Sequence, residues 1–352
     1  AILKLPQHIQ FVKDIPFDNL PPKDSLLFGP LIIGKTQDGG RTQGLAVLDS
    51  FLHERSKKYM LTISKPGISA RHCSRLSPHI AYGSLSVREI EQTTQKKMVY
   101  LNTSAEKEAK YFAQNLSAFL SRLAWRCHFV QKLEQQPNIE TNCMHPAFEG
   151  MRELYFREDY FEAWKTGRTG YPMVDACMRS LIQNGWITFR MRAMLVSFAS
   201  YHLWLDWRQT APYMAKLFTD YEPGIHYAQF QMQSGVTGIN AVRMYNPIKQ
   251  SIDHDPQGKF IRRYLHELEH VPDAFIHEPW KWPNMDKSYP TPIVHHETAI
   301  KQARQSLSEY WNQAGFKDQA MMVQQKLGSR NRTVKKGRRP KQSFKQMELF
   351  LD

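Results

Sequence analysis

The sequence predicts an all-α protein, and two observations support this fold class. Apolar residues recur at spacings of three and four in several long segments, most of which follow a capping residue or a proline. The alternation of apolar and polar residues that marks a half-buried strand is scarce throughout the chain. With 41% hydrophobic residues among 352, the chain has enough apolar surface for one large helical domain.

The clearest expected helix begins at Thr103 or Ser104, either of which can cap it, and buries a stripe that includes Phe112, Leu116 and Leu123. Residues 64–70 are expected to form a loop. Residues 219–258 are expected to form a long irregular segment, which in a compact domain usually serves a function. The remaining helices are expected over Thr42–Leu52, from Ser77 and Pro78, and over Pro172–Asn184, Phe189–Leu205, Lys259–Leu268 and His296–Trp311.

Composition divides the chain into three parts. Residues 1–40 are rich in Pro and Gly and are expected to form an extended arm. Residues 41–327 carry the helical periodicity and form the expected domain. Residues 328–352 are rich in Lys and Arg and poor in apolar residues, which predicts a disordered basic tail.

Charge points to a polyanionic partner. Lys and Arg number 47 against 33 acidic residues, a formal net charge of +14, which favours nucleic acid or an anionic surface. No apolar run reaches the ~18 residues that a spanning helix needs, and no signal peptide opens the chain. The four cysteines are scattered and form no metal-site spacing. We therefore expect a soluble intracellular protein without a structural metal.

Three groups of residues suggest a binding site, and each also has a plain structural explanation. The segment Ser74–Ser77 precedes a helix, so it can hold an anion or simply cap that helix. Arg122, Trp125 and Arg126 share a helical face that suits nucleic acid or a solvated surface. An Arg192–Asp220 pair can be structural or can hold a cofactor.

The tryptophans form a further group. Trp and Tyr side chains can carry an electron hole between a buried redox cofactor and the surface, although each ring taken singly is more often part of the core. The residues concerned are Trp164, Trp204 and Trp207.

Taken in order, these segments resemble the photolyase/cryptochrome family. The resemblance covers about residues 40–310, and it depends on several short motifs in sequence rather than on one. The matching stretches are Ser74–Pro78, Trp164–Ala176, Gly185–Trp186, Arg190–Arg192, Leu205–Arg208, Tyr245–Pro247 and His277–Trp280. The resemblance implies a helical FAD-binding domain without the N-terminal antenna domain.

The resemblance also assigns roles to residues. It implies a phosphate cradle at the Ser74 segment and an Arg192–Asp220 ion pair beneath the flavin ring. The cofactor-binding residues implied are Tyr59, Ser74, Arg75, Leu76, Ser77, Arg126, Arg192, Asp220, Glu222, His226 and Tyr227. The catalytic residues implied are Arg122, Trp125, Tyr227 and Met232; electron transfer falls to Trp164, Trp204 and Trp207, and DNA contacts to Arg122, Arg126, Phe189 and Arg190.

Several positions depart from the family pattern. The inner tryptophan of the electron-transfer chain falls at Phe230, a poor hole carrier, and the pocket glutamate for cyclobutane dimers falls at Arg122. The pocket asparagine falls at Phe189 and a base-sandwiching tryptophan at Met232. The run Asp220–Tyr227 is most similar to the bacterial iron–sulfur branch, and Cys177 matches one cluster ligand. No cysteine follows Cys177, so no cluster is expected.

The function implied is light-driven DNA repair by a lyase, in which reduced FAD gives an electron to a pyrimidine dimer, with the cyclobutane type favoured over the 6-4 type. The alternatives are a blue-light photoreceptor of cryptochrome type and a flavin-free nucleic-acid-binding module. The partner implied is dimer-containing DNA, bound by a monomer in the bacterial cytoplasm at the nucleoid. Near the C-terminus, Gln346, Leu349 and Phe350 resemble a sliding-clamp-binding motif, although a frayed terminus also explains them.

Overall fold

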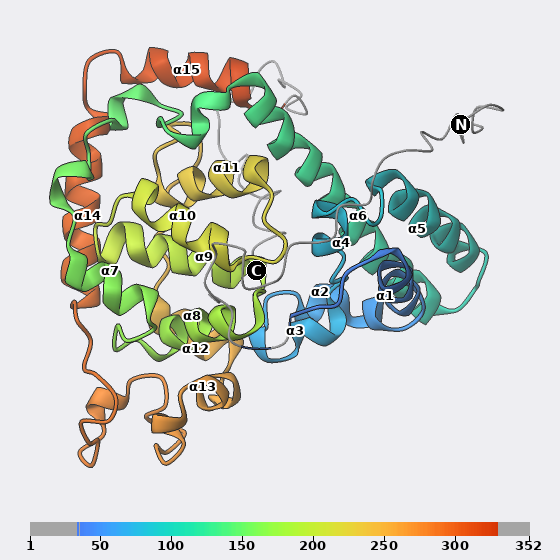
Figure 1. The fold of residues 1–352 in the computed structure, drawn as a ribbon, viewed down its shortest axis with the longest axis horizontal. Helices are drawn as coiled ribbons and strands as arrows, with labels where there is room; N and C mark the ends of the chain where they lie inside the picture. The colour runs from blue at the N-terminus through green and yellow to red at the C-terminus, as the bar shows by residue number, and fades with distance from the viewer. Residues whose placement is uncertain (1–33, 35, 330–352) are drawn as a thin grey trace, which may run out of the picture. The chain divides into compact units, whose positions relative to one another are not determined.

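The computed structural model describes residue 34 and residues 36–329, and their regular structure is helical throughout (Figure 1). Among these residues, no helix has both the length and the apolarity needed to cross a bilayer. The expected arm and basic tail lie almost wholly outside the described residues. The α-helices are α1 Arg41–His53, α2 Tyr59–Thr62, α3 Pro66–His72, α4 Ser77–Ala81, α5 Val87–Asn102, α6 Lys107–Gln135, α7 Glu158–Lys165, α8 Pro172–Asn184, α9 Phe189–Ser197, α10 Trp207–Leu217, α11 Pro223–Ser234, α12 Pro247–His254, α13 Lys259–Tyr264, α14 His296–Trp311 and α15 Phe316–Leu327.

Several expected helices are confirmed at or near their predicted ends. Helix α8 begins at Pro172, where a missing N–H costs nothing, and ends before Gly185. Gly185 has φ 67°, the left-handed conformation that glycine adopts without strain. Helices α1, α4, α13 and α14 also lie where the sequence predicts them.

Four predictions about local structure are wrong. Residues 64–70 are largely α3, and the segment 219–258 contains α11 and α12, each of which starts with a proline after an extended residue. The long helix α6 begins at Lys107 rather than Thr103, because Thr103 caps the end of α5, a helix that the pattern did not reveal. The helix predicted over Phe189–Leu205 is α9 followed by a π-helical turn at Phe198–His202.

Helix α6 contributes to the two smaller of the three hydrophobic clusters found among the described residues. Its first half contributes Phe112, Leu116 and Phe119 to a cluster with α1 and α2. Its second half contributes Phe129 to a smaller cluster with Ala228 of α11. The stretch of chain from α8 to α11, intervening turns included, supplies more than half of the main core, and these helices lie beside α6 in Figure 1. The candidate site combines residues of α6, α9 and the start of α11 with the loop before α4.

Candidate functional site

A bidentate ion pair forms one end of the candidate site. Arg192 of α9 donates from Nη1 and Nη2 to the two carboxylate oxygens of Asp220, at 3.0 and 2.9 Å. Its Nε donates to the Ile187 carbonyl, and its guanidinium carbon lies 4.1 Å from the centre of the Phe218 ring. The Asp220 side chain is only 5% exposed, so the two charges are fixed and largely desolvated together. We call this ion pair the ring end of the site, because the family resemblance implies that the flavin ring lies over it.

His226 lies beside the ring end in its neutral form. Its Nε2 lies 2.9 Å from the Ala211 carbonyl, which can only accept, so Nε2 carries the proton and Nδ1 is the acceptor. The pKa of His226 is lowered to about 4, mainly by burial and to a lesser extent by the positive charge of Arg192; the hydrogen bond to the Ala211 carbonyl and the charge of Asp220 oppose this shift. The imidazole therefore stays uncharged at neutral pH.

A second ion pair connects α6 to the start of α11. Arg126 donates from Nη2 to the Glu222 carboxylate at 2.8 Å, and both side chains are about one-fifth exposed. Gly224 permits this approach, because a Cβ at this position would lie 2.8 Å from the Cα of Val130 on α6. The close packing of two backbones thus places Arg126 and Glu222 at the ring end.

The loop before α4 has the backbone geometry of an anion site. Arg75 has φ 59° and Leu76 has φ −90° and ψ −12°, a left-handed residue followed by a right-handed one. Successive residues of opposite hand turn their N–H groups into one concavity, which binds anions. Arg55 donates to the carbonyls of Cys73 and Ser74, and Gln37 donates to that of Arg75, so these three carbonyls already have partners. We call this loop the phosphate end.

Positive charge accumulates at the phosphate end. The guanidinium carbon of Arg75 lies 4.1 Å from the centre of the Trp186 ring. Burial lowers the pKa of Arg75 to about 10; the Asp220 carboxylate opposes this effect, and Arg192 and Arg55 add to it. Arg75 is thus close enough to interact electrostatically with both members of the ring-end pair. The Asp220 carboxylate that acts on Arg75 is already paired with Arg192, so the charge of Arg75 is not balanced and the phosphate end is positively charged.

Tyr59 and Arg122 lie near the phosphate end. Tyr59 is 5% exposed and meets Phe51 and Phe119 edge to face. Burial raises the pKa of Tyr59 well above its usual value, and Arg122 opposes this by its charge and through a hydrogen bond. The Cys73 thiol is also within the electrostatic range of Arg75, Arg55 and Arg122. Arg122 therefore interacts with residues of the phosphate end, although its sequence position predicts a role in the lesion pocket.

The residues predicted to face DNA have varied surroundings. Trp125 is half-buried and stacks on Phe129 at 5.9 Å. Phe189 is 40% exposed, as a base-contacting ring should be, and Met232 is half-buried. Arg190 is 7% exposed and its Nε donates to the Ser64 hydroxyl at 3.0 Å, so little of it is open to a DNA phosphate. The roles of these residues remain predictions.

The three predicted electron-transfer tryptophans differ in environment. Trp164 and Trp207 are fully buried, and the indole of Trp164 donates to the Leu195 carbonyl at 3.2 Å. Trp204 is half-buried, has φ 53°, and lies under the guanidinium of Arg152, whose carbon is 4.5 Å from the ring centre. Trp207 meets Tyr227 edge to face at 6.3 Å.

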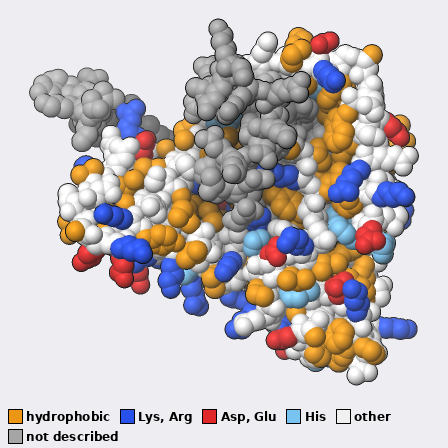
Figure 2. All heavy atoms as spheres, turned by 180° about the vertical axis from the view of Figure 1, so that it is seen from behind, with side chains coloured by type: hydrophobic (Ala, Val, Ile, Leu, Met, Phe, Trp, Pro, Cys, Tyr) orange, Lys and Arg blue, Asp and Glu red, His pale blue; other side chains and the backbone are white. Residues whose placement is uncertain are grey.

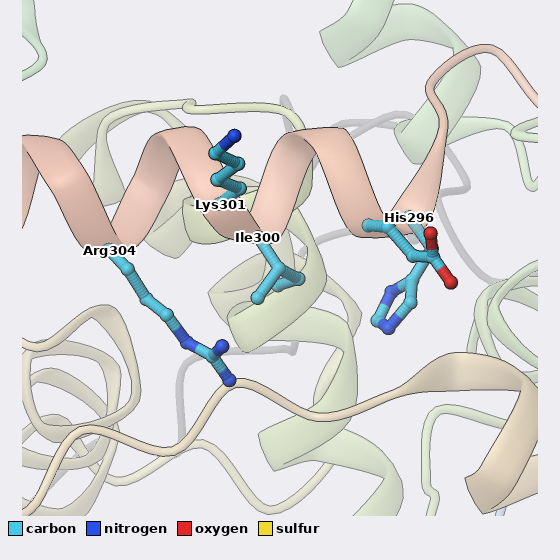
Figure 3. Close-up of a pocket in the computed structure, with 5 residues that line it drawn as sticks. His296, Ile300, Lys301 and Arg304 are labelled. Carbon is cyan, nitrogen blue, oxygen red and sulfur yellow. The ribbon is translucent and has the colours of Figure 1, made fainter.

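A hollow of about 290 Å³ on α14 shares no residue with the predicted site (Figure 3). Its lining residues all belong to this one helix, and Arg304, Ile300 and His296 point to the same side of it while Lys301 points away. In the described part of the chain, no three His, Cys, Asp or Glu side chains gather as metal ligands.

Lys and Arg side chains spread across the face drawn in Figure 2, which suits a polyanionic partner.

Sequence reasoning missed three residues that shape the phosphate end. Arg55 and Gln37 hold the carbonyls of the loop, and Gln37 lies 38 residues from its partner Arg75. Trp186 belongs to a motif that the sequence shows, but its stacking on Arg75 does not follow from that motif. Contacts at such separations have no local pattern, so no sequence signal pointed to them.

One helical domain thus carries both a cationic loop and a bidentate ion pair. Comparison with known proteins identifies its family. Residues 119–309 match the family model described as the FAD binding domain of DNA photolyase. This match spans more than half of the chain, and the chain therefore belongs to the photolyase/cryptochrome family, whose domain binds FAD.

Individual relatives support the same assignment. A deoxyribodipyrimidine photo-lyase of Alkalihalophilus pseudofirmus is 35% identical over 278 residues, which are 75% of this chain and 54% of that protein. The crystal structure of a class III photolyase from Agrobacterium tumefaciens superposes with a TM-score of 0.69 at 29% identity, covering 78% of this chain and 56% of that one. An archaeal photolyase from Sulfolobus tokodaii, crystallised with two FAD molecules, gives 0.63 at 30% identity and covers 77% of this chain and 56% of that one. The chain spans about half the length of the curated relatives it matches.

Proposed function

We propose that this chain repairs pyrimidine dimers in DNA by light-driven electron transfer from reduced FAD. The observation that carries the proposal is the pairing of a neutralised ring end with a cationic phosphate end in one helical domain. FAD has this same division, an uncharged ring and a charged diphosphate. Membership of the photolyase/cryptochrome family and the net charge of +14 both support a DNA substrate.

The residues of the chain prepare this chemistry rather than perform it. Bound FAD supplies the photoexcited electron donor. Arg192 and Asp220 orient the ring, and the neutral His226 lies next to them without adding charge. Arg75 and the N–H groups of its loop neutralise the diphosphate. Phe189, exposed at the start of α9, offers a surface on which a base can stack.

We propose the cyclobutane dimer as the lesion. A dimer is already poorly stacked in the duplex, so moving it into a pocket costs less than moving an intact base pair. By their sequence positions Arg122, Trp125 and Met232 would line this pocket, although Arg122 also interacts with Tyr59. Arg126 would lie near the DNA backbone, whereas Arg190, only 7% exposed, would offer it little of its side chain. Binding by such a cationic surface weakens steeply as the salt concentration rises.

A repair assay tests the proposal directly. The FAD-loaded protein, reduced with dithionite under argon, is illuminated with blue light beside oligonucleotides that carry one cyclobutane or one 6-4 dimer, single- and double-stranded. We expect loss of the cyclobutane dimer in light and none in the dark. If every dimer survives illumination of fully reduced protein, the repair function is wrong.

A photoreceptor function is the second candidate. Phe230 and Arg122 occupy positions where the resemblance implies an electron-transfer tryptophan and a lesion-binding glutamate. A cryptochrome DASH of Gloeobacter violaceus is 29% identical over 270 residues, 73% of this chain and 51% of that protein. A protein that binds FAD and responds to light but repairs neither dimer favours this function. An absorption spectrum without flavin bands favours a flavin-free DNA-binding module instead.

Several further assignments belong to the same proposal. Residues 41–327 would form the FAD-binding domain, acting as a monomer in the bacterial cytoplasm at the nucleoid. The clamp-binding motif at Gln346, Leu349 and Phe350 lies outside the described residues. A clamp pull-down with Leu349 and Phe350 changed to Ala tests it, and undiminished binding would argue against the motif.

A further inference from the structure

A compact aromatic cluster surrounds His226 at the ring end. The His226 ring lies 5.2 Å from Tyr221, 5.3 Å from Tyr227 and 4.5 Å from Phe230, measured between ring centres. Arg192 and Asp220 both act electrostatically on His226, so the cluster adjoins the pair that would hold the flavin ring. Phe218 also meets His226, at 5.9 Å; of these four rings, Tyr221 and Tyr227 are readily oxidised, whereas the two phenyl rings are not.

The two tyrosines lead from the buried site to the surface. Tyr227 is half-buried and Tyr221 is 36% exposed. Burial raises the pKa of Tyr221 well above its usual value, and Tyr227 adds to this by its charge and through a hydrogen bond between the two phenols. The carboxylates of Glu140 and Glu222 also act on Tyr221. Glu140 is exposed, so a proton acceptor and solvent both lie near this phenol.

The nearby tryptophans are less suited to end such a path. Trp207 meets Tyr227 at 6.3 Å but is fully buried, so a solution reductant cannot reach it. Trp204 lies 4.5 Å from the guanidinium carbon of Arg152, a residue that is 1% exposed. A desolvated cation over a ring face opposes a second positive charge on that ring. An electron hole is therefore disfavoured at Trp204.

We infer that Tyr221, reached through Tyr227, is the surface electron donor through which a thiol reductant recharges the bound flavin in light. This inference rests on the proposed function. In each of two photoexcitations Tyr221 gives one electron through Tyr227 to the bound flavin, and its phenolic proton passes to Glu140 or to water, so that two electrons reduce the oxidised flavin fully. A thiol in solution then returns one hydrogen atom to the Tyr221 oxygen, and two of the resulting thiyl radicals combine as a disulfide.

The test uses the FAD-loaded, oxidised full chain under blue light with dithiothreitol as the reductant. We expect Tyr221→Phe to slow loss of the oxidised-flavin absorption by about tenfold, which corresponds to about 1.4 kcal/mol in the barrier. The matched control is Tyr100→Phe on α5, a tyrosine that is 69% exposed, and it should behave as wild type. FAD content measured in the dark should be equal in all three proteins.

Electron paramagnetic resonance of samples frozen during illumination gives a second readout. Wild type should show a neutral tyrosyl radical that Tyr221→Phe lacks. An unchanged photoreduction rate in Tyr221→Phe, or a tryptophan radical in wild type, would overturn the inference. Dithionite-reduced protein bypasses this path, so failure of repair in that protein contradicts the proposed function and leaves the photoreduction result readable.

Discussion

The two ends of the candidate site differ in charge balance: positive charge is neutralised at the ring end and left in excess at the phosphate end. At the ring end, Arg192 is matched by the two oxygens of Asp220, and His226 is kept neutral beside them. At the phosphate end, the guanidinium of Arg75 lies over the Trp186 ring. Burial, together with the like charges of Arg192 and Arg55, lowers the pKa of Arg75 to about 10. The charges of the ring end are thus already matched, whereas we expect the phosphate end to gain stability when an anion binds.

The largest expected effect comes from breaking the ring-end pair. Asp220→Ala leaves Arg192 without its partner in a largely buried place, and we expect the free energy of unfolding to fall by about 3 kcal/mol. Urea denaturation measures this loss. The matched control is Asp159→Ala, which breaks an Arg157–Asp159 pair whose side chains are 56% and 60% exposed. Equal free energies of unfolding for the two variants would show that the Arg192–Asp220 pair does not stabilise the folded protein in the absence of a ligand.

The ring end should also impose a pH dependence through His226. Its pKa is about 4 in the folded protein, against about 6.5 for an ordinary histidine, so the unfolded chain takes up a proton first as the pH falls. Stability should therefore be constant above pH 6.5 and decline between about pH 6.5 and pH 4. Between pH 6.5 and 5 the contribution of His226 is about 2 kcal/mol, from about 1.4 kcal/mol per pH unit.

The variant His226→Gln isolates this contribution. Gln keeps a donor for the Ala211 carbonyl but does not titrate, so its unfolding free energy should depend less on pH than that of wild type. His202, whose burial lowers its pKa to about 3, titrates in both proteins and cancels in the difference. Parallel stability curves for the two proteins would be evidence against a buried neutral His226.

At the phosphate end, Arg75→Gln should reduce affinity for a ligand rather than stability. We expect the dissociation constant for FAD to rise about tenfold, or about 1.4 kcal/mol, the scale of one charge-assisted hydrogen bond. Binding of riboflavin, which has no phosphate, should be unchanged. Fluorescence titration measures both ligands. A similar loss for riboflavin would place Arg75 at the ring instead of the diphosphate.

The smallest expected effect is stabilisation by inorganic pyrophosphate. At a concentration equal to its dissociation constant, a ligand stabilises the folded state by about 0.4 kcal/mol. This corresponds to a rise in Tm of about 1 °C, which differential scanning fluorimetry resolves. The rise should disappear in Arg75→Gln and persist in Tyr100→Phe. Its persistence in Arg75→Gln would mean that pyrophosphate binds elsewhere on the basic surface.

The sequence by itself determined the helical class and the ends of α8 and α14, whereas the pairing of Arg192 with Asp220 was expected from the family resemblance. Caps, prolines and apolar spacing act within a few residues, so they can be recognised without a structure. A proline at the first position of a helix is such a local feature. Helices α11 and α12 both begin with one, but the polar residues around them led to the prediction of an irregular segment.

Only the tertiary structure decided which groups complete each end of the site. Arg55, Gln37 and Trp186 reach the Arg75 loop because segments remote in sequence pack together. The left-handed backbone of Arg75 and the neutral state of His226 also depend on that packing. Burial and long-range charge are properties of the assembled core, and no short stretch of sequence contains them.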